Sequence, residues 1–188
     1  DQIETAKGLP DTKIIDIPGI DYTWIGINVE KGDLADIKVR QAIRWAVDVD
    51  AIIQGAYSGA VSRAKTLLAP GLLGNWADAP LYARDVEKAQ ALLAESGKTG
   101  LAFSFTCLND AQSLAVAQIV QANLAEVGIT ININALDSGA YWALGADDAS
   151  KDLELSLIPY TSKFDPSFQT QWFLSSQIGL WNWQRWSS

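Results

Sequence analysis

The residues best able to carry chemistry or bind a ligand in this sequence are its paired aspartates and its tryptophans. None of the 188 residues is a histidine. A Ser-His-Asp triad, a Cys-His nucleophile and histidine metal sites are therefore excluded. Asp33 with Asp36, and Asp147 with Asp148, are the nearest candidates for paired carboxylate catalysis. Carboxylates so close in sequence usually face solvent, so a glycoside-processing enzyme is the weaker alternative.

Aromatic residues gather in the C-terminal stretch. The chain has eight tryptophans, and Trp172, Trp181, Trp183 and Trp186 fall within fifteen residues of one another. Such density exceeds what one helix face needs for packing. We expect about half of these rings in the core and the others in the wall of a ligand cleft, with Arg185 as a polar anchor.

Two further motifs favour structural roles. Gly97-Lys98-Thr99 matches the core of a phosphate-binding loop, but Leu92 occupies the position of the required first glycine. The segment also follows an expected helix, whereas phosphate binding needs a helix that begins there. A turn that ends the helix at Gly97 is predicted instead. The single cysteine, Cys107, is expected to be a buried, small apolar residue.

The amino-acid composition limits the kinds of molecule that the protein is expected to bind. Hydrophobic residues make up 48% of the chain, which suits one folded domain. The net charge is −8 and no run of lysine or arginine interrupts it, so no nucleic-acid partner is expected. No apolar stretch approaches the roughly 20 residues that span a bilayer. We predict no cofactor and no metal.

The elements that must position these residues alternate between strand and helix. Period-two and helical hydrophobic patterns predict strands at 13–17, 22–29, 101–107, 129–135 and 153–158. They predict helices at 36–48, 50–57, 85–95, 111–127 and 138–144, and a further helix that opens at Asp165-Pro166. This alternation favours an α/β domain over residues 22–188, with a mixed, mainly parallel sheet flanked by helices. Residues 1–21 are predicted to be a lead-in segment.

Three segments give the chain a family resemblance. Residues 36–43 read D-I-K-V-R-Q-A-I and residues 46–48 read A-V-D, while 82–97 and 121–133 carry weaker likenesses. In these segments the chain resembles the large extracellular solute-binding proteins of ABC importers, family 5, which include dipeptide, oligopeptide and nickel receptors.

The resemblance implies a periplasmic-binding-protein-like fold. It also implies that 22–188 form most of the second, C-terminal lobe of a longer, two-lobed receptor in the periplasm or tethered outside the cell. Such a receptor is not an enzyme: it closes over a solute and delivers it to a membrane permease.

The resemblance also locates a binding cleft. The position of the aspartate that accepts a peptide's amine in the peptide-binding branch holds Ser162, and no arginine lies near Asn109 to take the carboxylate. We therefore expect a neutral, ring-rich cleft for a peptide-like solute, with an opine or a glycoside as the alternative. The residues predicted to line it are Trp142, Tyr160, Ser162, Asp165, Trp172, Trp181, Trp183 and Arg185.

Overall fold

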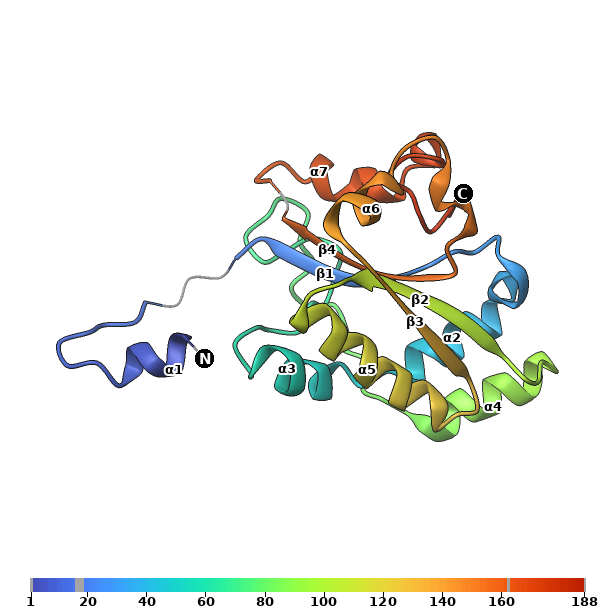
Figure 1. The fold of residues 1–188 in the computed structure, drawn as a ribbon, viewed down its shortest axis with the longest axis horizontal. Helices are drawn as coiled ribbons and strands as arrows, with labels where there is room; N and C mark the ends of the chain where they lie inside the picture. Colours follow the sequence, from blue (N-terminus) through green and yellow to red (C-terminus); the bar gives the residue numbers. More distant parts are fainter. Residues whose placement is uncertain (1, 16–18, 162, 188) are drawn as a thin grey trace.

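A four-stranded mixed sheet forms the centre of the protein (Figure 1). The computed structural model describes residues 2–15, 19–161 and 163–187. The strands are β1 (Asp21–Ile27), β2 (Ala102–Leu108), β3 (Thr130–Leu136) and β4 (Leu155–Thr161), in the spatial order β1-β4-β2-β3. Strand β2 is parallel to both β3 and β4, and only β1 runs antiparallel to its neighbour. The predicted fold class, a mixed and mainly parallel sheet flanked by helices, is confirmed.

The longer helices cover one face of this sheet, and shorter elements cover the other (Figure 1). The first face carries α2 (Ile37–Ala46), α3 (Val49–Tyr57), α4 (Val86–Ser96) and α5 (Ala111–Ala125). The second carries α6 (Ser138–Ala143), α7 (Ser167–Thr170) and the 3-10 turns η3 (Gln171–Phe173) and η4 (Ser175–Gln177). Two other 3-10 turns are η1 (Gly32–Ala35) and η2 (Ala149–Asp152).

Aspartates fix where most of these helices begin. Each of α2 to α6 is preceded by an aspartate whose carboxylate accepts a backbone N–H of the first turn: Asp36, Asp48, Asp85, Asp110 and Asp137. Such caps satisfy donors that the helix itself leaves free. Helix α4 ends at Gly97, whose φ of 67° is left-handed, so the predicted turn is confirmed and no helix opens at this motif.

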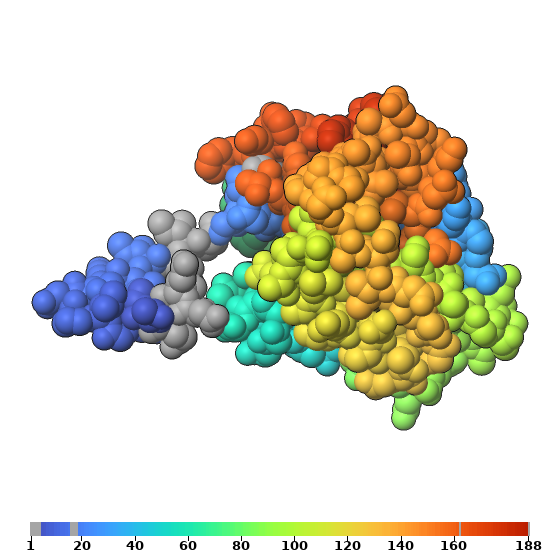
Figure 2. Space-filling model, viewed as in Figure 1, coloured from blue at the N-terminus to red at the C-terminus, as the bar shows by residue number. Residues whose placement is uncertain are grey.

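Two hydrophobic clusters hold the layers together. The aliphatic layer lies between the sheet and α2–α5 and contains Val39, Ile43, Phe105, Val116 and Leu124, together with the buried Cys107. The aromatic layer lies on the opposite face and is built on Tyr141, Ile158, Trp172 and Trp183, with Trp24, Trp142 and Tyr160 packed against them. In the space-filling view, orange and red residues from α6 onward form one mass over this face (Figure 2).

Four details differ from the expectations. The lead-in contains a helix, α1 (Gln2–Lys7), that its polar sequence did not indicate. Residues 13–15 form no strand, and the rest of the strand expected at 13–17 lies outside the described residues. Strand β4 begins two residues late, because 149–152 form the turn η2. The helix opened by Asp165-Pro166 has only four residues, so Trp172 and Phe173 lie in η3 instead.

Candidate functional site

The carboxyl ends of the parallel strands meet at one edge of the sheet. Strands β2, β3 and β4 end there at Leu108, Leu136 and Thr161, and the antiparallel β1 begins there, since Asp21 stands opposite Thr161. Open α/β sheets bind ligands beyond the carboxyl ends of their strands. This edge is therefore the candidate functional site.

A continuous row of rings leads from this edge into the aromatic layer. Tyr22 stands directly opposite Tyr160 in the β1–β4 pairing. Ring centroids are 5.5 Å apart for Tyr22 and Trp24, and 5.3 Å apart for Trp172 with either Trp24 or Tyr160. The Gln171 side chain donates to the Tyr160 hydroxyl at 3.4 Å. Burial raises the pKa of Tyr22, so its hydroxyl stays protonated and can donate a hydrogen bond at neutral pH.

Five of the eight residues predicted to line a cleft lie together in this layer. Trp172 is at their centre, with ring centroids 5.3 Å from Tyr160, 5.3 Å from Trp181 and 5.6 Å from Trp183. Trp142 contacts Trp183 at 6.2 Å. Trp172 and Trp183 are each 1% exposed, whereas Trp181 is 36% exposed. The buried pair therefore supports the layer, and the partly exposed rings Trp142, Tyr160 and Trp181 are the ones that solvent reaches.

A buried glutamine ties the ring row together. With its amide oxygen toward β1, Gln184 accepts from the Trp24 indole N–H at 2.7 Å and donates to the Trp172 carbonyl at 3.2 Å. It can approach because Gly26 has no side chain: a Cβ there would lie 3.1 Å from the Gln184 amide. The C-terminal segment is thereby fixed on the face of β1.

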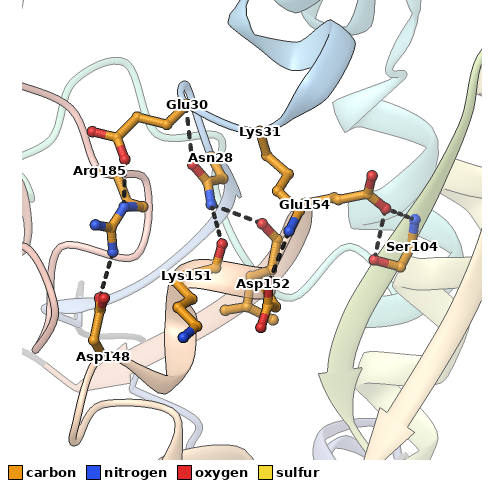
Figure 3. Close-up of polar contacts among 10 residues, drawn as sticks. Asn28, Glu30, Lys31, Ser104, Asp148, Lys151, Asp152, Glu154 and Arg185 are labelled. Atoms are coloured by element: carbon orange, nitrogen blue, oxygen red, sulfur yellow. Dashed lines mark hydrogen bonds and ion pairs between the residues drawn. The ribbon is translucent and has the colours of Figure 1, made fainter.

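Arg185 lies between two carboxylates, Glu30 and Asp148 (Figure 3). Its guanidinium donates to Glu30 at 2.6 Å and to Asp148 at 2.5 Å, and these two carboxylates hold its pKa above the ordinary value. Glu30 follows the carboxyl end of β1, whereas Tyr160 pairs near the amino end of that strand. The guanidinium of Arg185 is therefore held at the end of β1 away from Tyr22 and Tyr160, next to Gln184 in the chain.

The same end of the sheet contains a second group of polar contacts, around Asn28 and Lys31 (Figure 3). The buried Asn28 amide donates to the carbonyls of Leu153 at 2.8 Å and Lys151 at 3.3 Å, and Lys31 pairs with Asp152 at 2.9 Å. These contacts join the chain after β1 to the turn before β4. Together with Arg185 they brace the fold.

The remaining two predicted residues stand apart from the rings. Asp165 is exposed, and its carboxylate accepts the Ser167 backbone N–H at 2.9 Å, which lowers its pKa. This contact stabilises the start of α7. Ser162 lies outside the described residues.

Sequence reasoning missed Tyr22, Trp24 and Gln184. The alternation of β1 was visible in the sequence, and it puts Tyr22 and Trp24 on the face opposite Ile25 and Ile27. That alternation could have identified both rings. No sequence signal indicates Gln184, because its role depends on how the tail returns to β1.

Three of the four candidate carboxylates have structural partners. Asp148 is paired with Arg185, Asp33 is paired with Lys98 at 2.8 Å, and Asp36 caps α2. Among the described residues, no group of three or more His, Cys, Asp or Glu side chains could hold a metal ion. Within the same residues, no helix is long and apolar enough to cross a membrane.

Comparison with known families decides what kind of protein carries this site. Residues 1–180 match the family described as bacterial extracellular solute-binding proteins, family 5, middle region. The chain belongs to this family. Family-5 proteins are solute-binding components of ABC importers, not enzymes, and are found in the periplasm or outside the cell.

Individual relatives agree with this assignment. The chain is 35% identical to the dipeptide-binding protein of Escherichia coli K12 over 134 residues, 68% of this chain and 25% of that protein. It is 28% identical to the glutathione-binding protein GsiB of the same organism over 186 residues, which cover 96% of this chain and 36% of GsiB. This family-5 chain thus spans about a quarter to a third of these two relatives.

Solved structures show the same fold. HbpA2 of Haemophilus parasuis superposes on all of the chain with a TM-score of 0.87 and 26% identity, and 38% of that protein is covered. The periplasmic binding protein DppA of Helicobacter pylori, in complex with the peptide STSA, also covers the whole chain, with a TM-score of 0.86 and 24% identity. The four-stranded sheet and both of its layers therefore have counterparts in longer binding proteins.

Proposed function

We propose that this chain is most of the second lobe of a two-lobed receptor that binds a peptide-like solute and delivers it to an ABC permease. The observation that carries the proposal is the ring row of Tyr22, Trp24, Tyr160 and Trp172, which begins at the carboxyl edge of the sheet in a family-5 fold. In the proposal this edge faces the first lobe, and the solute binds between the two lobes.

The chemistry of the edge favours a neutral, extended solute. Half-buried rings offer flat apolar faces with hydrogen-bonding tips, and Gln171 adds an amide beside Tyr160. Backbone groups of a strand can also pair with an extended peptide. The names of the relatives, a dipeptide-binding and a glutathione-binding protein, support a peptide-like solute.

The predicted lining residues divide into two groups under this proposal. Trp142, Tyr160 and Trp181 have solvent-accessible surface, and we propose that they contact the solute together with Ser162 and Asp165. Trp172 and Trp183 act from beneath by holding those rings in place. Arg185 acts indirectly, because its ion pairs fix the C-terminal segment that carries Gln184.

Nuclear magnetic resonance titration of the 188-residue chain tests the site. Alanyl-alanine and glutathione at about millimolar concentration should shift the resonances of Tyr22, Tyr160 and the indole N–H of Trp24. Resonances of Trp45, in the helical face, should not move. Tyr160→Ala should abolish the shifts, whereas Lys88→Ala, which removes an ammonium group packed on Trp45, should leave them unchanged. Maltose and octopine serve as the glycoside and opine probes. If only these two compounds shifted the resonances, the solute would be assigned to their class and not to peptides.

The two-lobe proposal also predicts the strength of binding. One lobe supplies about half of the contacts, so the isolated chain should bind these peptides with a Kd weaker than about 1 µM. Calorimetric titration measures this value. Micromolar or tighter binding by the chain alone would show that a second lobe is not needed.

A further inference from the structure

The outer edge of β1 carries backbone groups that no strand of the described sheet takes up. Strand β1 is an edge strand and pairs with β4 on one side only. The Asn28 N–H donates to Glu154, which lies opposite it in the same register, so Tyr22, Trp24 and Gly26 direct their backbone groups toward β4. Thr23, Ile25 and Ile27 direct theirs outward.

The outward direction is already used just beyond the end of the strand. Val29, which has the same parity as Ile27, donates its N–H to the Gln184 carbonyl at 2.9 Å. An added strand on this edge would therefore continue the backbone pairing that Gln184, in the C-terminal segment, makes with Val29. Edges left open in this way are templates for further pairing.

A groove of about 1100 Å³ runs along the same edge. Its lining includes consecutive β1 residues from Asp21 to Ile25, which point alternately to both faces, so it lies beside the strand. The far wall comes from α2, α3 and residues 61–67, with apolar side chains such as Ile37, Val49 and Val61. The volume exceeds the 300–1,000 Å³ typical of small-molecule pockets.

The charge around the groove is opposite to that of the whole chain. Four of its lining residues are cations, namely Arg40, Arg44, Lys65 and Arg63, the last paired with Asp50 at 3.6 Å, and Asp21 is its single acidic lining residue. The chain as a whole has a net charge of −8. Two copies joined edge to edge would bring two cationic rims together, which argues against self-pairing.

We infer that this groove takes an extended, apolar strand with acidic ends, which pairs with the outward groups of Thr23, Ile25 and Ile27 and adds a fifth strand to the sheet. The inference rests on the proposed function for the source of that strand: a part of the longer receptor polypeptide. The relatives leave room for it, since the chain covers 25% of the dipeptide-binding protein and 38% of HbpA2.

Hydrogen exchange of the 188-residue chain tests the pairing. The probe is the peptide Asp-Val-Thr-Val-Thr-Val-Asp, and the control is the same peptide with proline in place of both threonines. The probe should slow exchange at Thr23, Ile25 and Ile27 by about tenfold or more and leave Tyr22, Trp24 and Gly26 unchanged. Equal slowing at all six positions, or none, would overturn the inference. Slowing that rises with protein concentration in the absence of peptide would replace it with a second copy.

A charge-swap pair tests the choice of acidic ends. Arg44→Glu should weaken binding of the Asp-ended probe and strengthen binding of a Lys-ended version. Lys88→Glu is the matched control, because Lys88 also contacts the Trp45 ring but does not line the groove. If Arg44→Glu changed the binding of neither peptide, that result would contradict the charge argument. Because these readouts lie on β1's outer edge and solute shifts involve Tyr160, failure of one proposal is distinguishable from failure of the other.

Discussion

The two faces of the sheet are covered by different means. On one face, four capped helices press branched aliphatic side chains such as Ile43, Val116 and Leu124 onto the strands. On the other, short turns hold tryptophans and tyrosines whose polar atoms also bond: Tyr141 donates to the Leu157 carbonyl at 2.5 Å and Trp183 to Leu180 at 2.9 Å. The helical face depends on regular secondary structure, whereas the aromatic face depends on individual ring contacts.

The strongest test of this contrast removes one central side chain from each layer. Trp172→Ala should lower the free energy of unfolding by about 3–5 kcal/mol, because it empties a site contacted by Trp24, Tyr160, Trp181 and Trp183. Leu124→Ala should cost about 2–5 kcal/mol. Urea unfolding measures both values. Near-ultraviolet circular dichroism should collapse only for Trp172→Ala, and a loss under 1 kcal/mol in that variant would show that the aromatic layer is loosely packed.

A smaller effect should follow from adding one methyl group to each layer. In Gly26→Ala the new Cβ would lie 2.8 Å from Ser156 Oγ and 3.1 Å from Ile158 Cδ1, so about 1–3 kcal/mol should be lost. Gly55→Ala on α3 is the matched change, since its Cβ meets only the mobile end of Ile119. That variant should be neutral or gain up to about 1 kcal/mol from helix propensity. Equal losses in the two variants would remove the distinction between the layers.

The smallest predicted change concerns one hydroxyl. Tyr141→Phe removes the bond to Leu157 and should cost about 1 kcal/mol near neutral pH. Burial raises the pKa of Tyr141, so above a pH of about 10 the unfolded tyrosine ionises while the folded one stays protonated. Stability of the original chain should therefore fall as pH rises through this range, and more steeply than that of Tyr141→Phe. Thermal unfolding from pH 8 to 11 measures the two slopes, and parallel curves would contradict the assignment.

The same contrast explains what the sequence could reveal. Hydrophobic periodicity and capping residues such as Asp85 and Gly97 identified the helices of the aliphatic layer, because regular elements repeat their pattern locally. The sequence indicated the aromatic layer only through its high number of tryptophans near the C-terminal end. Its geometry depends on pairings between distant residues, such as Tyr22 with Tyr160 and Gln184 with Trp24, which leave no local pattern. Arg185 was predicted as a polar anchor for the ligand, and no local pattern indicated that its guanidinium pairs with Glu30 and Asp148.

Cys107 gives the aliphatic layer a reporter of its own. The thiol is fully buried within that layer, it is the chain's single cysteine, and burial raises its pKa. A thiol-modifying reagent can reach it only when the helices part from the sheet, which also removes the burial that disfavours the reactive thiolate. Labelling of this sulfur therefore times the opening of one face, while hydrogen exchange of the Trp183 indole N–H, which donates to Leu180, times the opening of the other.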